Sequence, residues 1–460
     1  MSWQETSQKG IFSRSMGENE TLTKLSGDAG LPLNRENWAI NSTATVVPTG
    51  SFVSADLAAR FRNAWAHLRF QHPSIAAEVA PDDTSIIYTV PADRVALDDW
   101  VSRTFSVASD ANSSADVIPA FHPTPYAKLV YIPRSGELLG HTAHWRMDGI
   151  GVILLLDALL AIASSPSSLA DPASLSWGTE IERLAPAVEV AATIPKESTP
   201  ELRERGAALV GTFAHAAGAI GIPYLGGAAT LPGGTRNAAL TFSPTTTEKI
   251  VAACKARNVS VTAAVHASVA GANYALASTA LVNKHYASTV RFTLRPYLPE
   301  PYSTSAFATG LYTMVWMKRV ESEASWAERL QDYQAEYRKG VTREFLDSHR
   351  EYAAQLGALI RNLPQGGGQP PSDVDISSIG IAEKLIRRSY GTTEAGFEVK
   401  AVSVGVEILS RQAVTFVWTF RDQLNFSAVY NESFHSADQM NQFVATVRSQ
   451  LLEGLGVEDS

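Results

Sequence analysis

The pattern of apolar and polar positions switches between helical and strand periods along the whole chain. In residues 54–71 apolar side chains recur every three or four positions, which predicts an amphipathic helix with Ser54 as its N-cap. Short β-branched and aromatic runs at 85–91 and 127–133 end in proline and predict strands. Residues 1–50 show little periodicity and predict short strands and loops.

The most apolar stretch begins at Gly149 and ends at Ala163, directly after a strand-like segment, GELLGHTAHW. It is about 15 residues long and contains Asp157, whereas a membrane span needs roughly 20 apolar residues, so it predicts a buried helix. The predicted order is strand, tight turn at 147–149, helix. Such a turn can present a side chain into a cleft on a rigid scaffold.

The second half of the chain repeats this mixture of elements, so we predict an α/β (α+β) fold. Its patterns predict helices at about 324–337 and 436–453, a surface loop at 364–373, and strands at 237–243, 286–299, 308–320, 400–409 and 414–431, the last with a hairpin turn near Arg421.

The length of the chain and one cluster of turn residues set the expected domain boundaries. A chain of 460 residues is too long for one ordinary core. Glycine and proline gather at 221–234, where we place a crossover. We therefore expect an N-terminal domain at 1–190, a linker at 191–236 and a C-terminal domain at 237–460.

Composition narrows the class of protein. Hydrophobic residues make up 45% of the chain and charged residues 18%, as in a globular protein with a sizeable core. A net charge of -8 argues against binding a nucleic-acid backbone. Cys254 is the only cysteine, which excludes intrachain disulfides and cysteine-based metal sites. The polar N-terminus lacks a signal-peptide core, so we expect a cytoplasmic protein without a membrane span.

Candidate chemistry centres on the signature His-Xaa-Xaa-Xaa-Asp-Gly, formed by His144, Asp148 and Gly149. A neutral imidazole is suited to take a proton from a hydroxyl or amine near neutral pH. The spacing alone also fits a surface turn in which Asp148 caps the following helix. Other histidines, such as His67 and His266, fall in predicted helices and suggest no metal set, so we expect no metal.

The segment resembles the active-site motif of the CoA-dependent acyltransferase superfamily, which includes chloramphenicol acetyltransferase, plant BAHD acyltransferases and condensation domains. It looks nearest to the fungal trichothecene 15-O-acetyltransferase-like branch. Looser similarities follow in family order, at Trp3, Arg14, Glu18, 68–79, 100–107, 177–186, 376–391 and 424–434. Two departures narrow the branch: Ala143 replaces the first histidine of condensation domains, and the Asp-Phe-Gly-Trp-Gly motif of plant enzymes is absent.

The resemblance implies two chloramphenicol-acetyltransferase-like sandwich domains that form a pseudo-dimer with a tunnel between them. It also implies direct transfer from acyl-CoA, expected to be acetyl-CoA, which is a co-substrate and not a bound cofactor. His144 is then the general base and the Gly149 amide faces the oxyanion. Asp148 has a structural role and braces the loop against Arg291, with Arg295 as the alternative partner.

The acceptor is expected to be a small hydroxylated secondary metabolite of a fungus, such as a terpenoid, polyketide or alkaloid. Side chains in the second half could line its pocket, although they fit an ordinary core equally well: Tyr312, Trp316, Trp418, Asn425 and Ser427. The implied pseudo-dimer lets one chain build the cleft, so we expect a monomer.

Three alternatives stay open. The first keeps the fold but takes the acyl group from a carrier protein, as condensation domains do. The second is a cyclase or pericyclase on the same fold, which would work without an acyl donor. The third is a binding protein, whose product profile would not change in His144→Ala.

Overall fold

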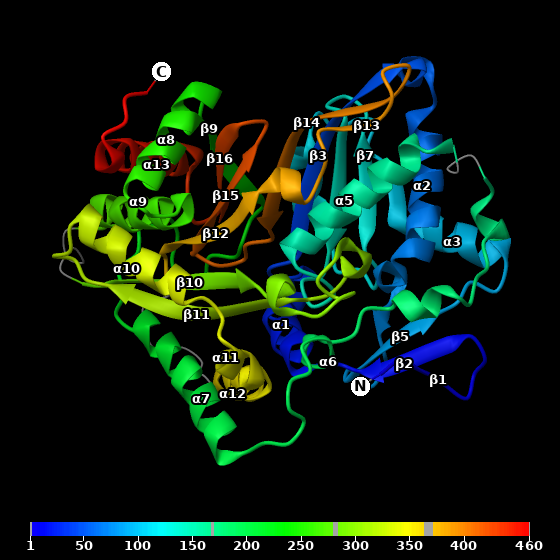
Figure 1. Cartoon of the computed structure of the whole chain (residues 1–460), viewed down its shortest axis with the longest axis horizontal. Coiled ribbons are helices and arrows are strands. Elements are labelled where there is room, and N and C mark those ends of the chain that lie inside the picture. Colours follow the sequence, from blue (N-terminus) through cyan, green and yellow to red (C-terminus); the bar gives the residue numbers. More distant parts are fainter. Residues whose placement is uncertain (1, 167–169, 279–283, 363–370, 460) are drawn as a thin grey trace. The chain divides into compact units, whose positions relative to one another are not determined.

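The computed structural model describes residues 2–166, 170–278, 284–362 and 371–459. Its elements, shown in Figure 1, belong to two compact units. Unit 1 comprises Met1–Glu197, Thr293–Tyr312 and Glu383–Glu407, and unit 2 comprises Ser198–Phe292, Thr313–Ala382 and Ile408–Ser460. The predicted boundaries at 190 and 237 did not anticipate the two later segments that return to unit 1. Most of the predicted loop at 364–373 lies outside the described residues.

Unit 1 is built on a six-stranded sheet of order β13-β14-β3-β8-β7-β6 and a smaller sheet of order β1-β2-β5-β4. In the large sheet β6 and β7 are parallel and the other pairs antiparallel. The strands are β1 (Gln4–Glu5), β2 (Ile11–Ser15), β3 (Ile40–Gly50), β4 (Glu78–Val79), β5 (Ser85–Thr89), β6 (Phe105–Val107), β7 (Lys128–Ile132), β8 (Glu137–Thr142), β13 (Ser389–Gly391) and β14 (Ala395–Val406). The helices are α1 (Glu18–Asp28), α2 (Leu57–Gln71), α3 (Arg94–Thr104), α4 (Ser114–Val117), α5 (Gly149–Ser164) and α6 (Val188–Ala191).

Unit 2 has a four-stranded sheet of order β12-β15-β16-β9 and a two-stranded sheet of β10 and β11. Its strands are β9 (Thr235–Thr241), β10 (Tyr286–Thr293), β11 (Thr313–Val320), β12 (Val374–Ile381), β15 (Ala413–Phe420) and β16 (Gln423–Asn431). Its helices are α7 (Pro200–Gly211), α8 (Pro244–Ala256), α9 (Val261–Leu276), α10 (Trp326–Lys339), α11 (Arg343–Asp347), α12 (His349–Arg361) and α13 (Ala437–Leu455). Helices α8, α9, α10 and α13 share one apolar core with the four-stranded sheet.

Helix α5 is the buried helix that the apolar stretch predicts. Its buried residues lie all around its axis, because it packs between α2 and the strands β3, β8 and β14 of the large sheet (Figure 1). Its sixteen residues are apolar enough for a core, yet no helix in the described part of the chain combines the length and apolar character that a bilayer crossing needs.

Three local predictions were wrong, and each has a physical reason. The cap of α2 is Asp56, whose carboxylate accepts from the Ala59 amide at 3.0 Å, so the helix begins after Ser54. Helix α1 was missed because its apolar residues are few; the Glu20 carboxylate, which accepts from the Gly17 backbone amide at 2.8 Å, and other buried polar contacts stabilise it instead. The turn after β8 lies at 144–146, since Asp148 has the extended backbone of an N-cap.

Candidate active site

His144 begins the turn that joins the end of β8 to the start of α5. Every other residue in 141–148 is buried, whereas the His144 side chain is half-buried. The turn therefore buries its other side chains and leaves His144 partly exposed. A half-buried histidine on a rigid strand–turn–helix frame is well placed for proton transfer.

Asp148 fastens the far end of this turn. One carboxylate oxygen, Oδ1, accepts from the Gly151 amide at 2.8 Å, which caps α5. The other, Oδ2, accepts from the Tyr312 amide at 3.0 Å. Arg295 donates from Nη1 to both oxygens, at 2.8 and 2.7 Å. Since both oxygens are engaged by the chain itself, Asp148 holds the loop.

Arg295 joins the same carboxylate to a second stretch of backbone. Its Nη2 donates to the carbonyls of Ala308 and Gly310, each at 3.1 Å, and its guanidinium lies 5.4 Å from the ring centre of Tyr312. Both partners of the ion pair are 8% exposed at the side chain. The segment that returns to unit 1 at 293–312 thus wraps around Asp148.

Arg291, the first predicted partner of Asp148, pairs with a different carboxylate. It donates from Nη2 to Asp375 Oδ2 at 2.9 Å, in unit 2. The alternative prediction, Arg295, gives the ion pair of the structure. The reason is the path of the chain: Arg291 lies on β10, and only the residues after Phe292 return to unit 1.

Two glycines leave room for neighbouring atoms at the start of α5. A Cβ on Gly151 would lie 2.3 Å from the carbonyl oxygen of Ala308, so only glycine lets the 308–310 segment reach the helix. A Cβ on Gly149 would lie 3.2 Å from Val404 Cγ2, a tighter contact than usual. That the Gly149 amide faces the oxyanion stays a prediction. Gly151 was missed, although its place three residues after the capping aspartate is a usable signal.

Arg146 braces the turn from inside. It is buried, and it donates to Thr142 Oγ1 at 2.9 Å, to the carbonyl of Ala77 at 3.0 Å and to the carbonyl of Pro125. Burial lowers the pKa of Arg146 to about 10, which still leaves it cationic at neutral pH. Sequence reasoning missed this residue because its acceptors are mostly backbone carbonyls far along the chain.

His141 has a structural role in the same strand. Its Nδ1 lies 2.9 Å from Asn41 Oδ1 and its ring stacks on Phe121 at 3.9 Å. Burial lowers the pKa of His141 to about 3, so the ring stays neutral at physiological pH. Among the described residues, no group of three or more His, Cys, Asp or Glu side chains is placed to hold a metal ion.

Tyr312 lies inside the core of unit 1. Its side chain is fully buried, and its hydroxyl donates to the carbonyl of Pro186 at 3.3 Å. Its backbone amide is the group that reaches Asp148. In the structure Tyr312 thus supports the loop, and its contact with an acceptor stays a prediction.

The other predicted acceptor residues lie in unit 2. Trp418, Asn425 and Ser427 share one face of the β15–β16 hairpin, because Trp418 pairs directly with Asn425 and side chains alternate along a strand. The opposite face carries the apolar core, with Val417 and Phe426. Trp316 is apart from them on β11, where it donates to Glu336 at 2.8 Å. Their contact with an acceptor stays a prediction.

Known proteins similar to this chain include acetyltransferases. No model of a known protein family matches the chain. Over its full length it is 40% identical to the acetyltransferase pigO of Monascus ruber, of which it covers 99%. It is 30% identical over its full length to the O-acetyltransferase pigM of Monascus ruber, of which it covers 88%.

The fold agrees with these relatives. The trichothecene 15-O-acetyltransferase TRI3 of Fusarium sporotrichioides has a similar structure, with a TM-score of 0.82 over 98% of this chain and 97% of that chain, at 18% identity. The two α/β units with the His144 turn are thus those of a CoA-dependent acyltransferase fold, and the predicted fold class is confirmed. The chain belongs to the family of the fungal acetyltransferases pigO and pigM, and the protein is an acetyltransferase of fungal secondary metabolism.

Proposed function

We propose that the protein is an acyl-CoA-dependent O-acetyltransferase that transfers the acetyl group directly to a hydroxyl of a small secondary metabolite, with His144 as the general base. One observation carries the residue assignment: within 141–148, His144 has the only side chain that is not buried. The names of the relatives pigO and pigM support the reaction class.

The proposed reaction needs one base and no covalent enzyme intermediate. The acceptor oxygen attacks the thioester carbonyl while the His144 imidazole takes its proton. The C–O bond forms, the C–S bond breaks, and the imidazolium returns the proton to the CoA thiolate. Backbone amides at the start of α5, that of Gly149 first, would stabilise the oxyanion, since a helix N-terminus favours negative charge.

Asp148 is assigned to the loop and not to the imidazole. Its oxygens already accept from Arg295, Gly151 and Tyr312, which leaves it bound to the helix cap and to the 308–312 segment. Its contribution to catalysis is therefore geometric: it holds the turn that carries His144. Positional errors of about 1 Å can cost on the order of 100-fold in rate, so such support is functionally significant.

The acceptor pocket is proposed to include Trp418, Asn425 and Ser427. The three share a sheet face that is turned away from the apolar core of unit 2. An indole surface with an amide and a hydroxyl beside it suits a ring system that carries oxygen substituents. We further propose that the protein is cytosolic and monomeric. Light scattering of the purified protein would test whether it is a monomer.

Mass spectrometry of hydroxylated fungal metabolites tests the whole assignment. Wild type and His144→Ala are each incubated with acetyl-CoA, with an acetyl-loaded carrier protein, and without a donor. We expect the mass of an acetyl group to be gained with wild type and acetyl-CoA only. Transfer from the carrier protein alone would replace CoA as the donor, and conversion without a donor would indicate a cyclase. Equal acetylation by wild type and His144→Ala would refute the role of His144.

A further inference from the structure

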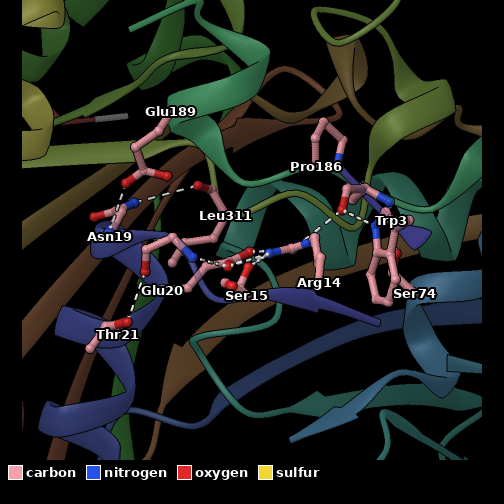
Figure 2. A network of polar contacts seen from close by, with 12 residues as sticks. Trp3, Arg14, Ser15, Asn19, Glu20, Thr21, Ser74, Pro186, Glu189 and Leu311 are labelled. Atoms are coloured by element: carbon pink, nitrogen blue, oxygen red, sulfur yellow. Dashed lines mark hydrogen bonds and ion pairs between the residues drawn. The ribbon is translucent and has the colours of Figure 1, made fainter. Parts of the chain in front are cut away.

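A buried polar network joins distant segments of unit 1 next to the Asp148 loop. Figure 2 shows Trp3, the end of β2, the start of α1, Ser74, Pro186, Glu189 and Leu311 drawn together. At its centre Arg14 donates to both oxygens of Glu20, at 2.7 and 2.6 Å, and both side chains are almost fully buried. Such a buried ion pair holds both side chains in place, because moving either partner away would leave a buried charge unpaired.

The network anchors the crossover residues to the N-terminal segment. Arg14 Nη2 and Trp3 Nε1 both donate to the carbonyl of Ala185, at 3.3 and 3.1 Å, and Arg14 lies 5.1 Å from the Trp3 ring centre. The Ala185 amide donates in turn to Ser74 Oγ at 2.9 Å. Residues 185–189 are thus held from two sides, which places Glu189.

Glu189 holds the first turn of α1. Its Oε1 accepts from the backbone amide of Asn19 at 2.8 Å. Its Oε2 lies so close to Gly17 that a Cβ there would be 2.2 Å away. The side chain is 2% exposed. Burial first, and then the negative charges of Glu20 and Glu18, raise the pKa of Glu189 to about 7, while the Asn19 amide opposes this rise.

Asn19 reaches from this turn to the peptide group between Leu311 and Tyr312. Its Nδ2 donates to the Leu311 carbonyl at 3.5 Å, a long hydrogen bond, as Figure 2 shows. The amide of the same peptide group is the one that donates to Asp148 Oδ2 at 3.0 Å. In a planar trans peptide the C=O and N–H point in opposite directions. One rigid plane is therefore held by Asn19 on one edge and by Asp148 on the other.

We propose that Asn19, oriented by Glu189, is a positioning residue for catalysis: it sets the Leu311–Tyr312 peptide plane, and through that plane Asp148 and the His144 turn. The proposal rests on the proposed function for its catalytic consequence. Without the Asn19 contact the plane can rotate, and the Tyr312 amide then leaves the line of Asp148. Arg295 still pairs with Asp148, so the turn loosens but stays folded.

Asn19→Leu tests the proposal, because leucine has a similar volume and no amide donor. The matched control is Ser26→Ala, which removes a hydroxyl that bonds within the same helix, to the Leu22 carbonyl at 3.3 Å. We expect Asn19→Leu to lower kcat about tenfold with KM within about twofold, as for loss of one geometric hydrogen bond. The control should match wild type in both constants.

Hydrogen–deuterium exchange of the peptide around Tyr312 gives a readout that needs no turnover. We expect exchange there to be about tenfold faster in Asn19→Leu and unchanged in Ser26→Ala. Glu189→Ala should accelerate it as well, and Glu189→Gln, which retains an acceptor for the Asn19 amide, should restore it. If Asn19→Leu does not fold, Asn19→Ala, which removes the donor without adding charge or bulk, takes its place.

The two hypotheses fail in different ways. If wild type transfers no acyl group from any donor, the proposed function is refuted, and the exchange experiment still decides whether Asn19 holds the peptide plane. If wild type is active but Asn19→Leu changes neither kcat nor exchange at Tyr312, the positioning role is refuted. An equal loss in Ser26→Ala would also refute it, because α1 stability would then be the cause.

Discussion

Two aspartate–arginine pairs, one in each unit, show how similar contacts can serve different ends. Asp148 and Arg295 tie a helix N-cap to an irregular loop beside the His144 turn, and both side chains are 8% exposed. Asp375 and Arg291 tie β12 to β10: Asp375 also accepts from the amide and the hydroxyl of Thr289, at 3.0 and 2.6 Å. The first pair supports the turn that carries His144, and the second pair joins two strands.

The largest effect should separate these two arginines. Arg295→Ala leaves Asp148 buried without its cation, which costs about 3–5 kcal/mol of unfolding free energy, and the loosened turn should lower kcat by on the order of 100-fold. Arg291→Ala should also destabilise the protein but leave kcat nearly unchanged in the folded fraction. Denaturant unfolding with acetyl-transfer kinetics measures both. Equal kcat losses in the two variants would contradict the comparison.

How far sequence reasoning reached is also visible in these pairs. The spacing of the signature allows Asp148 to cap the following helix, the family resemblance implies its salt bridge, and both arginines were considered as its partner. The choice between them depends on where the chain leaves unit 2, at 292–293, and no local pattern encodes that path. By contrast the hairpin near Arg421 was predicted correctly, because Arg421 and Asp422 form a local turn with positive φ.

The supports around the turn were mostly missed for a related reason. Arg146, Gly151 and Tyr312 act through backbone carbonyls and amides of distant segments. Backbone groups are the same at every position, so a sequence does not show which of them will meet. Glu189 and Asn19 belong to the same class, since their contacts span 170 and 292 residues of chain.

The second prediction compares one helical glycine from each unit. Gly151→Ala in α5 forces a Cβ against the Ala308 carbonyl at 2.3 Å, so overpacking should cost about 1–3 kcal/mol and lower kcat. Gly211 is the last residue of α7, and a Cβ there would meet no atom within 4 Å. Gly211→Ala should therefore be neutral or stabilise the protein by up to about 1 kcal/mol. Melting temperatures and kcat test this, and a harmless Gly151→Ala would show that the 308–310 segment yields easily.

The third prediction concerns two buried carboxyls with raised pKa values, Glu189 in unit 1 and Asp373 in unit 2. Burial is the main cause for both, and each pKa lies at about 7. For Glu189 the folded value exceeds the ordinary 4.5, so the native state binds the proton more tightly. Stability from this group is complete below pH 4.5 and is lost as pH rises towards 7, by at most ~3 kcal/mol.

Replacing each carboxyl by its amide isolates its share. Glu189→Gln and Asp373→Asn should each gain stability relative to wild type between pH 5 and pH 7, as followed by urea unfolding at fixed pH steps. Above pH 7 the kcat of Glu189→Gln should rise relative to wild type, because ionised Glu189 faces Glu18 and Glu20 while Arg14 is already paired. Asp373→Asn should show no such rise. Parallel kcat profiles for all three proteins would separate Glu189 from the His144 turn.

The smallest expected effect comes from two buried tyrosine hydroxyls that each donate to a carbonyl. Tyr312 donates to Pro186 at 3.3 Å in unit 1, and Tyr352 donates to Val315 at 2.5 Å in unit 2. Since the shorter contact is the stronger, Tyr352→Phe should cost about 1–1.5 kcal/mol and Tyr312→Phe about 0.5 kcal/mol. Neither should change kcat, because Tyr312 acts on Asp148 through its backbone amide and phenylalanine retains that amide. A marked loss of kcat in Tyr312→Phe would show that its hydroxyl, and not the peptide plane, sets the position of the His144 turn.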